Sequence, residues 1–339
     1  MDPPVTKPKL LAIELWGVGD LVIATPFLQA ASEVFDVTLL AKPHAQALGA
    51  RFFPSVKVIE FVAPWTAFRH KYRLLHWPWR EIFRLRALIA QGNFGFGLSA
   101  RWDPRDHVLL RFLGIRRRIG FPRRGSGILL TDALTRPGPE AHRYEYWRKV
   151  AQVLNLDLPP REKIGIASKP ASDLVVIHTG AGNEVRVWPL DRYRNLVAKL
   201  RREKYKVAVL CDVPQQAWWL SAGEKTVIAP QSIKELDTSL CLAGAFIGND
   251  SGPGHLAALS GIPTFTLFGS AVPEWFAPLH PAAEWLIKPC PYRPCWNYCR
   301  FPAPNCILDL DEEWVWSRVQ QFLTKHIRNP SAPCSGSRL

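Results

Sequence analysis

The sequence has no apolar run of about 18 residues, the length that a membrane-spanning helix needs. Its first nine residues are polar and rich in proline, without the apolar core of a signal peptide. It also has no repeat of fixed period, no low-complexity tract, and no helix-turn-helix, zinc-finger or RNA-binding aromatic signature. We therefore expect a cytoplasmic protein that does not bind nucleic acid.

Cysteine is sparse, and its spacing is not that of a common metal-binding motif. The chain has 7 cysteines, and none of them forms a Cys-x-x-Cys pair. A cytosolic compartment keeps thiols reduced, which argues against a disulfide framework. We interpret four closely spaced cysteines as a structural loop with free thiols, namely Cys290, Cys295, Cys299 and Cys306. A metal site or a local disulfide is the alternative.

Acidic residues are fewer than basic ones. The chain has 43 Lys and Arg against 29 Asp and Glu, a formal net charge of +14, which suggests an acidic partner. Much of the excess lies in the first half, where basic residues between Phe68 and Arg86 accompany Trp65, Trp77 and Trp79. Such a mixture fits a protein that lies against anionic lipid headgroups. An ordinary solvated basic face is the alternative.

Three segments repeat one pattern of apolar strand, glycine-containing turn and helix. The strands are expected at 10–15, at 174–177 and in the apolar run before Asn249, and the helices at 21–34, 190–203 and 255–260. Because each half of the chain opens with its own βα unit, we expect an α/β fold of two doubly wound domains that face a central cleft.

The boundary between these domains is expected near residue 165, in a polar, proline-rich stretch that follows a helix-like segment at 141–154. An N-terminal domain would span 1–165 and a C-terminal domain 166–328. A final helix is expected at 312–326. Residues 329–339 are expected to be a disordered tail.

A polar turn in the second half is suited to an anion. Asn249, Asp250, Ser251 and Gly252 lie between an apolar run and a helix. Free backbone N–H groups at a helix start would face a ligand above the strand. A nucleotide diphosphate is the natural occupant.

Three separated motifs carry a family resemblance. They are Gly17-x-Gly19-Asp20 with Pro26, then Arg186-x-Trp188-Pro189, and then Asn249-Asp-Ser-Gly-Pro-x-His255 followed by Gly261-x-Pro263 and Phe268-Gly269. Their order and spacing, over roughly residues 9–325, resemble glycosyltransferase family 9, which contains the ADP-heptose:lipopolysaccharide heptosyltransferases. The resemblance implies a GT-B fold of two Rossmann-like domains, with the sugar nucleotide mainly on the C-terminal one. In this fold the final helix, 312–326, would cross back toward the N-terminal domain.

Asp20 is the candidate general base. It follows two glycines at the end of the first strand, where the open edge of a doubly wound sheet meets the cleft. Glycosyl transfer needs a group that takes the proton of the acceptor hydroxyl, and a carboxylate there can serve. The resemblance implies this role, and capping of the following helix is a second role that the position allows.

Arg186 is the candidate cation for the leaving group. A departing nucleoside diphosphate gains negative charge, which a fixed cation stabilises. Many members of the family have lysine at this place, and the planar fork of arginine is not equivalent to that point charge. A surface residue ahead of the helix that Pro189 opens is the alternative.

The resemblance also implies further binding residues. Ser251 and Gly252 would line the diphosphate and the sugar, Asp250 would bond sugar hydroxyls, and His255 would contact phosphate or merely hold the loop. The predicted donor contacts are Gly19, Thr179, Gly180, Ala181, Gly182, Gln231, Asp250, Ser251, Gly252 and His255. The predicted contacts to acceptor phosphates are Arg116, Arg118 and Arg123.

A possible metal motif is better explained as a helix cap. Asp309-Leu-Asp311 spells the Asp-x-Asp pattern of metal-dependent glycosyltransferases, but it directly precedes a helix start. We therefore interpret Asp311 as the N-cap and expect neither a metal nor a cofactor.

These features together predict an inverting, metal-independent glycosyltransferase. It would move a heptose or related sugar from a nucleotide-sugar donor, ADP-heptose, to a phosphorylated glycolipid, the lipopolysaccharide core. We expect a monomer, peripheral at the cytoplasmic face of the anionic inner membrane. The alternatives are transfer to a protein or to another polysaccharide, and a non-catalytic basic protein of the same fold that binds membranes or polyanions.

Overall fold

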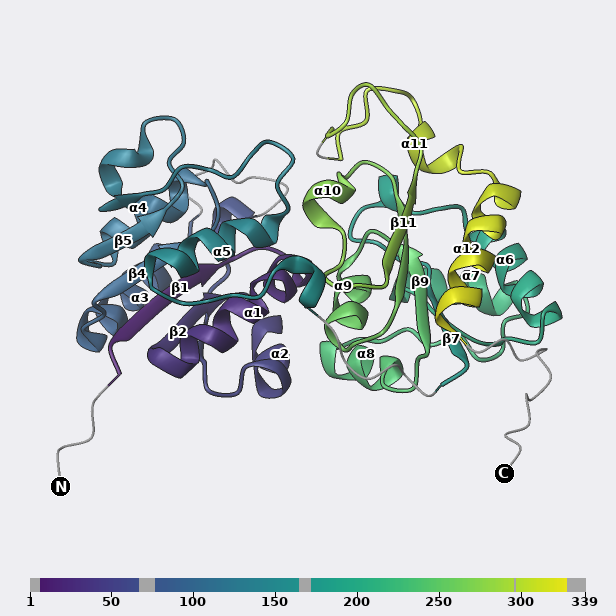
Figure 1. The fold of residues 1–339 in the computed structure, drawn as a ribbon, viewed down its shortest axis with the longest axis horizontal. Coiled ribbons are helices and arrows are strands. Elements are labelled where there is room, and N and C mark those ends of the chain that lie inside the picture. Colours follow the sequence, from purple (N-terminus) through teal and green to yellow (C-terminus); the bar gives the residue numbers. More distant parts are fainter. Residues whose placement is uncertain (1–6, 67–76, 165–171, 296, 328–339) are drawn as a thin grey trace. The chain divides into compact units, whose positions relative to one another are not determined.

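The computed structural model describes residues 7–66, 77–164, 172–295 and 297–327. The chain divides into two compact units, Met1–Pro159 and Pro160–Leu339 (Figure 1). The expected boundary at residue 165 and the expected tail at 329–339 lie outside the described residues. No helix within the described ranges combines the length and the apolarity needed to cross a membrane.

The first unit contains a parallel sheet of six strands in the order β3-β2-β1-β4-β5-β6. Its central strand β1 is a nearly continuous apolar run, as expected of a strand that is covered on both faces. The strands are β1 (Lys9–Glu14), β2 (Asp36–Ala41), β3 (Lys57–Glu60), β4 (Phe96–Ser99), β5 (Arg117–Gly120) and β6 (Asp132–Ala133).

Helices and a buried aromatic cluster complete this unit. The helices are α1 (Val18–Val34), α2 (His44–Phe52), α3 (Trp79–Gly92), α4 (Pro104–Phe112) and α5 (Arg143–Val153). Trp65, in the 3₁₀ turn η1 (Pro64–Thr66), is only 4% exposed and packs in the core with Phe61 and Ile82. The expectation that Trp65 contacts lipid headgroups is therefore wrong, because the ring is already buried in the protein.

The second unit contains a parallel sheet of five strands in the order β11-β10-β9-β7-β8. The strands are β7 (Leu174–His178), β8 (Lys206–Leu210), β9 (Ala245–Asn249), β10 (Thr264–Phe268) and β11 (Ala283–Ile287). The helices are α6 (Leu190–Arg202), α7 (Gln216–Ser221), α8 (Ile233–Leu240), α9 (Gly252–Leu259), α10 (Pro273–Phe276), α11 (Asn305–Leu308) and α12 (Glu312–His326).

Amphipathic helices cover this second sheet. In α6 the buried side chains of Tyr193, Leu196, Val197 and Leu200 follow the spacing of one helical face. The final helix α12 buries its apolar side chains in the core of its own unit. The expectation that α12 crosses back toward the first domain stays a prediction.

The predicted doubly wound α/β architecture is confirmed in both units. Two helices begin three residues earlier than expected: α1 begins at Val18 rather than Leu21, and α9 begins at Gly252 rather than His255. Gly17 caps α1, and Pro253 lies in the first turn of α9, where a missing N–H is tolerated.

The strand orders fix where a ligand can bind in each unit. Ligands of open α/β sheets bind outside the carboxyl ends of the strands, at the point where the strand order reverses. This reversal lies between β1 and β4 in the first sheet and between β7 and β9 in the second.

Candidate functional site

Asp20 lies at the reversal point of the first sheet. It is the third residue of α1, and its Oδ2 accepts a hydrogen bond from the backbone N–H of Gly17 at 3.4 Å. Its side chain is 21% exposed, so it is available to a ligand as well as to the helix start. The structure therefore shows the capping contact and leaves the catalytic role as a proposal. Gly19 precedes it in the same first turn and is half-buried.

Arg101 is the main partner of Asp20. It follows β4, and its Nη1 donates to Asp20 Oδ1 at 2.6 Å. Its guanidinium carbon also lies 4.2 Å from the ring centroid of Trp16. This cation–π contact holds the guanidinium in addition to the ion pair with Asp20. The sequence analysis missed Arg101, because the pairing joins residues 81 positions apart and depends on β1 lying beside β4.

A buried carboxyl group lies at the end of β1, near this pair. Glu14 is 3% exposed, and burial, followed by the nearby charge of Asp20, raises its pKa to about 8. Arg101 and Arg143 oppose this shift. Glu14 is therefore mostly protonated at neutral pH, and it accepts a hydrogen bond from the backbone N–H of Trp16 at 3.2 Å.

The predicted acceptor arginines differ in their surroundings. Arg116 and Arg123 are exposed. Arg118 uses its guanidinium to donate to the carbonyl groups of Ile115 at 2.7 Å, Arg116 at 3.0 Å and Leu129 at 2.6 Å. Arg118 thus holds a loop of its own unit, and its contact with an acceptor stays a prediction.

Asn249 ties together the motifs of the second unit at its reversal point. Its Nδ2 donates to the carbonyl groups of Thr179 at 3.0 Å and Gly180 at 3.2 Å. Its Oδ1 accepts from the backbone N–H of Trp188 at 3.0 Å and from the hydroxyl of Tyr193 at 2.9 Å. Both donors and both acceptor lone pairs of this fully buried amide are thus used. They hold the loop after β7 and the start of α6 against the end of β9.

Arg186 and Asp250, two of the predicted donor residues, form an ion pair. Arg186 ends the 3₁₀ turn η5 (Glu184–Arg186), and its Nη1 lies 3.2 Å from Asp250 Oδ2. Its Nε donates to Asn297 Oδ1 at 2.8 Å, and the Ser270 hydroxyl donates to the same oxygen at 2.7 Å. The guanidinium is therefore fixed in place, with its side chain 28% exposed. Asn297 and Ser270 were not foreseen from the sequence.

The turn after β7 approaches the rest of the unit closely. The Thr179 hydroxyl donates to Gln215 Oε1 at 2.9 Å and accepts from Trp219 Nε1 at 3.1 Å, so this side chain is directed into the protein. A Cβ on Gly180 would lie 2.1 Å from the carboxyl carbon of Asp212, so a larger residue there would displace the Asp212 side chain.

The remaining turn residues lie nearer the surface. Gly182 is exposed and Ala181 is half-buried. The backbone N–H of Ala181 hydrogen-bonds the carboxylate of Asp212, and a contact of Ala181 or Gly182 with the donor stays a prediction.

The residues around α9 are placed as a helix start. Ser251 is the N-cap, Gly252 is the first helical residue, and His255 is buried inside the helix. Gln231, the predicted contact to the nucleotide base, is exposed just before α8, and its backbone N–H donates to Glu235 Oε2 at 2.9 Å.

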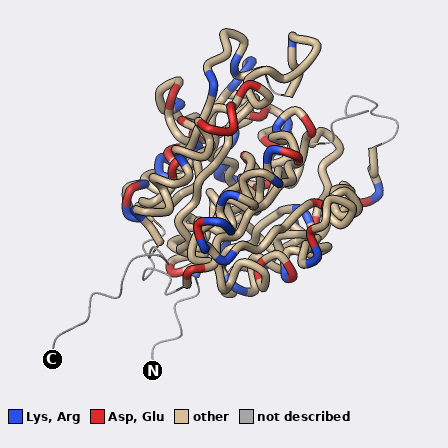
Figure 2. Tube along the Cα trace, turned by 90° about the vertical axis from the view of Figure 1, so that its right-hand side faces the viewer, with Lys and Arg blue, Asp and Glu red and all other residues tan. Residues whose placement is uncertain are grey.

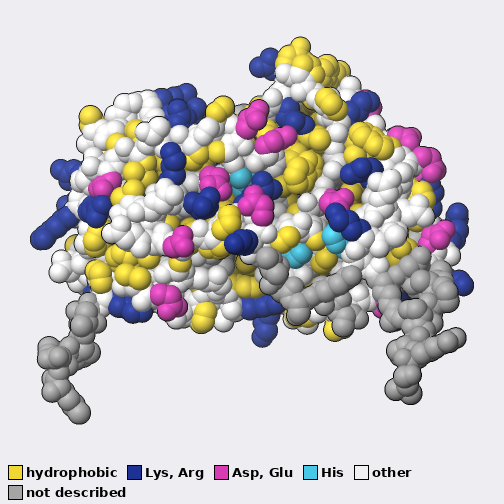
Figure 3. Space-filling model, viewed as in Figure 1, with side chains coloured by type: hydrophobic (Ala, Val, Ile, Leu, Met, Phe, Trp, Pro, Cys, Tyr) yellow, Lys and Arg dark blue, Asp and Glu magenta, His cyan; other side chains and the backbone are white. Residues whose placement is uncertain are grey.

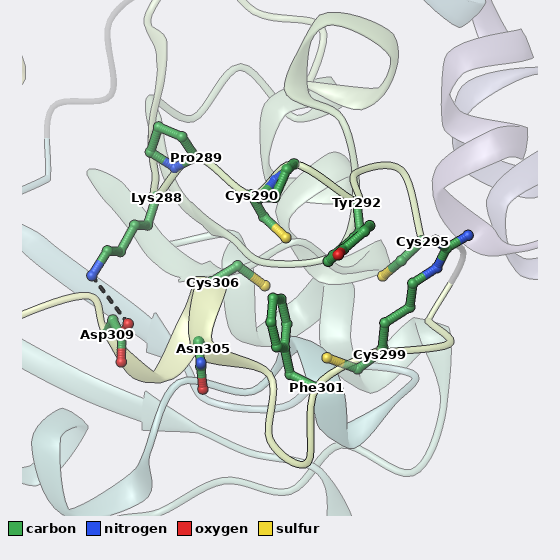
Figure 4. Close-up of a pocket in the computed structure, with 12 residues that line it drawn as sticks. Lys288, Pro289, Cys290, Tyr292, Cys295, Cys299, Phe301, Asn305, Cys306 and Asp309 are labelled. Carbon is green, nitrogen blue, oxygen red and sulfur yellow. Dashed lines mark hydrogen bonds and ion pairs between the residues drawn. The ribbon is translucent and has the colours of Figure 1, made fainter.

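The cysteine-rich loop surrounds a cavity of about 150 Å³ (Figure 4). Cys290, Cys295, Cys299 and Cys306 line it together with aromatic rings, and all four thiols are free. Burial and the neighbouring cysteines raise the pKa of Cys306 to about 11, so its thiol is protonated at neutral pH. Across the part of the chain that the structure describes, no three His, Cys, Asp or Glu side chains are placed to hold a metal ion.

The Asp-x-Asp motif is a helix cap, as predicted. Asp311 Oδ1 accepts from the backbone N–H groups of Glu313 at 2.9 Å and Trp314 at 3.1 Å. Asp309 pairs instead with Lys288 at 3.0 Å.

Solved structures share this fold. A glycosyltransferase family 9 protein from Veillonella parvula is 17% identical, with a TM-score of 0.73 over 95% of this chain and 99% of its own. The E. coli heptosyltransferase WaaC with ADP is 16% identical, with a TM-score of 0.71 over 93% of this chain and 99% of its own. The E. coli ADP-heptose lps heptosyltransferase II is 18% identical, with a TM-score of 0.68 over 94% and 99%. These likenesses confirm the predicted GT-B fold.

Sequence comparison gives the family. Lipopolysaccharide heptosyltransferase 1 of Pseudomonas aeruginosa is 29% identical in an alignment of length 211, which covers 54% of this chain and 59% of that relative. The alignment thus spans less than two thirds of the relative's length. The model of the family described as Glycosyltransferase family 9 (heptosyltransferase) matches residues 84–301, which are more than half of the chain. The predicted resemblance is therefore confirmed. The chain belongs to glycosyltransferase family 9.

Proposed function

We propose that this chain is an inverting glycosyltransferase that moves a heptose or a related sugar to a lipopolysaccharide core acceptor. The observation that carries the proposal is the placement of the motif residues. Asp20 lies at the reversal point of the first sheet, and Arg186 and Asp250 lie at that of the second, where open α/β sheets bind their ligands. Membership in family 9 supports roles in glycosyl transfer for the residues at these positions.

ADP-heptose is the proposed donor. The E. coli relative WaaC was solved with ADP and with ADP-2-deoxy-2-fluoro heptose, which supports an adenine nucleotide. In this chain the donor would meet the backbone of Ala181, Gly182 and Gly252, with Arg186 beside the diphosphate. The cation would stabilise the charge that forms on the leaving phosphate, so we propose transfer without a metal.

The proposed reaction is a single displacement. Asp20 takes the proton from the acceptor hydroxyl as its oxygen attacks the anomeric carbon, and the bond to the nucleoside diphosphate breaks on the opposite face. The configuration at this carbon is thereby inverted. The acceptor is a phosphorylated glycolipid, so we propose that the protein works as a monomer, peripheral at the cytoplasmic face of the membrane, with Arg116 and Arg123 near acceptor phosphates.

Coupled measurement of ADP release and product mass tests the proposal. The protein is incubated with ADP-heptose and a core acceptor, and NMR gives the anomeric configuration of the product. Release of ADP together with an acceptor that gains one heptose is expected. Binding of the acceptor without transfer, by a chain that also fails with other nucleotide sugars and with protein or polysaccharide acceptors, would instead support a non-catalytic polyanion-binding protein.

A further inference from the structure

Three elements of the first unit present apolar side chains to solvent on one side. Phe83 of α3 is 56% exposed, Val108 of α4 is 54% exposed, and Ile128 of the 3₁₀ turn η3 (Ser126–Leu129) is 90% exposed. Isolated exposed hydrophobic residues need no explanation, but a contiguous group of them marks an interaction site.

Phe83 and Val108 belong to one continuous surface, and Ile128 directly precedes Leu129, which lines the edge of that surface. The rings of Phe83 and Phe112 pack edge to face with centroids 5.7 Å apart. Val108 and Phe112 then line an open hollow of about 300 Å³ together with Arg86 and Arg111. The docking face is defined here as Phe83, Arg86, Val108, Arg111, Phe112 and Ile128.

Positive charge surrounds this face. The guanidinium carbon of Arg86 lies 5.0 Å from the ring centroid of Phe112. Residues 107–131 contain six arginines and no acidic residue, and Arg111, Arg116 and Arg123 among them are exposed. Within the described ranges, neither Arg86 nor Arg111 has an acidic side chain within ion-pair distance.

Most of the charge excess belongs to this unit. Residues 1–159 contain 23 Lys and Arg against 13 Asp and Glu, whereas residues 160–339 contain 20 against 16. Figure 2, seen from the side of the second unit, shows basic and acidic residues interleaved along the chain. On the first unit, basic and hydrophobic side chains lie next to one another (Figure 3).

We propose that the docking face binds the surface of an anionic lipid bilayer. Phe83, Val108 and Ile128 would enter the boundary between headgroups and acyl chains, while the arginines meet lipid phosphates. A second copy of the chain fits less well, because a two-fold interface here would set arginines against arginines. Nucleic acid would leave the aliphatic side chains in water. The inference deepens the proposed function, since a glycolipid acceptor is reached at such a surface.

Flotation with vesicles tests the proposal, in the absence of donor and acceptor. The full chain is mixed with vesicles of phosphatidylcholine containing 30% phosphatidylglycerol, on the order of the anionic content of a bacterial membrane, or with phosphatidylcholine alone. We expect strong binding to the anionic vesicles only. Arg86→Gln/Arg111→Gln should weaken it by about five-fold for each arginine, and Ile128→Ser by about ten-fold.

The second unit offers a matched control. Arg194→Gln/Arg202→Gln removes two exposed arginines, and Leu242→Ser removes an aliphatic side chain that is 73% exposed. These changes should leave vesicle binding unchanged. Equal losses in the control and docking-face variants, or no loss in either, would overturn the proposal. So would unchanged vesicle binding combined with loss of self-association or of RNA binding in the docking-face variants.

The same variants separate this inference from the proposed function. Heptosyl transfer to a delipidated, water-soluble core acceptor should be unchanged in Arg86→Gln/Arg111→Gln. Absence of transfer by the unmodified chain would contradict the proposed function and leave the vesicle result standing.

Discussion

The guanidinium of Arg101 lies 2.6 Å from the carboxylate of Asp20 and rests on the indole of Trp16. An opposite charge at this distance favours the ionised form of a carboxyl group and restricts its orientation. Arg101 thereby holds the carboxylate of Asp20 in one orientation. We expect it to act as a positioning residue, through Asp20.

Arg101→Gln is expected to lower kcat while changing KM for the donor little. A charge-assisted hydrogen bond contributes about 1.5–3 kcal/mol, so the loss should be about 10-fold to 100-fold. Arg101→Lys should restore part of the rate, because it restores the charge but not the stacking on Trp16. Steady-state kinetics of ADP release measure this.

Arg117→Gln is the matched control for Arg101. Arg117 pairs with Asp132 at 2.8 Å on the outer part of the same sheet. A similar fall in kcat for both variants would show a general loss of folding in the first unit and would remove Arg101 from the mechanism.

Asp20→Asn is expected to abolish most of the turnover and to leave donor affinity nearly unchanged. General-base catalysis contributes roughly 10²–10⁴-fold, and asparagine still has an oxygen for the N–H of Gly17. Calorimetric titration with ADP and kinetics of transfer give the two quantities. Asp132→Asn serves as the control, and turnover near that of the control would dismiss Asp20 as the base.

Arg186→Ala is expected to weaken ADP binding and to lower the rate further. The cation meets phosphate in the ground state and more strongly as the leaving group departs. Loss of Arg186 also leaves Asp250, which is 5% exposed, without this cation. Arg186→Lys should retain much of the activity, whereas Arg194→Ala, at an exposed position of α6, should change nothing. An alanine variant with normal ADP affinity would contradict the assignment to the diphosphate.

Local patterns were enough to predict three of the strands and the turns that follow them. The strand at 174–177 and the helix at 190–203 match β7 and α6 to within one residue at each end. Such segments carry their own signal, since apolar runs and helical spacing depend only on neighbours in the sequence. Thr179 shows the limit of this reasoning. It lies in the predicted turn, but its side chain bonds Gln215 and Trp219, which come from later elements.

The partners of the charged site residues could not be predicted. Arg101 and Asn297 meet Asp20 and Arg186 across 81 and 111 residues of sequence. Nothing near Arg101 distinguishes it from the other arginines of the first half. Its role depends on β4 lying beside β1, which only the strand order decides.

The buried carboxyl of Glu14 predicts a stability that falls as the pH rises. Its pKa is about 8 in the folded chain, against an ordinary value of 4.5. Between these values the unfolded chain releases the proton and the folded chain keeps it, so the free energy of unfolding decreases by up to about 1.4 kcal/mol per pH unit. Above pH 8 Glu14 is ionised in both the folded and the unfolded chain, so its contribution to the slope of stability against pH ends.

Urea unfolding between about pH 5 and 8, the range between the two pKa values of Glu14, checks this prediction. Glu14→Gln cannot ionise, so it should be more stable than the unmodified chain near the top of this range and should show a smaller slope. A remaining slope is expected from Asp106, whose pKa burial raises to about 7. Glu60→Gln, at an exposed position, is the control. Identical slopes for Glu14→Gln and the control would mean that Glu14 is not buried as described.

Asp309 and Asp311 can be separated by experiment, because the structure gives them different partners. Asp311→Ala should lower the free energy of unfolding by about 1 kcal/mol, since the first turn of α12 loses its cap. Asp309→Ala should cost less, because its pair with Lys288 is nearly half exposed and screened by water. Neither change should alter transfer or its response to EDTA. If both variants instead lost activity that Mg²⁺ or Mn²⁺ restored, the two carboxylates would be metal ligands and the cap would be incidental.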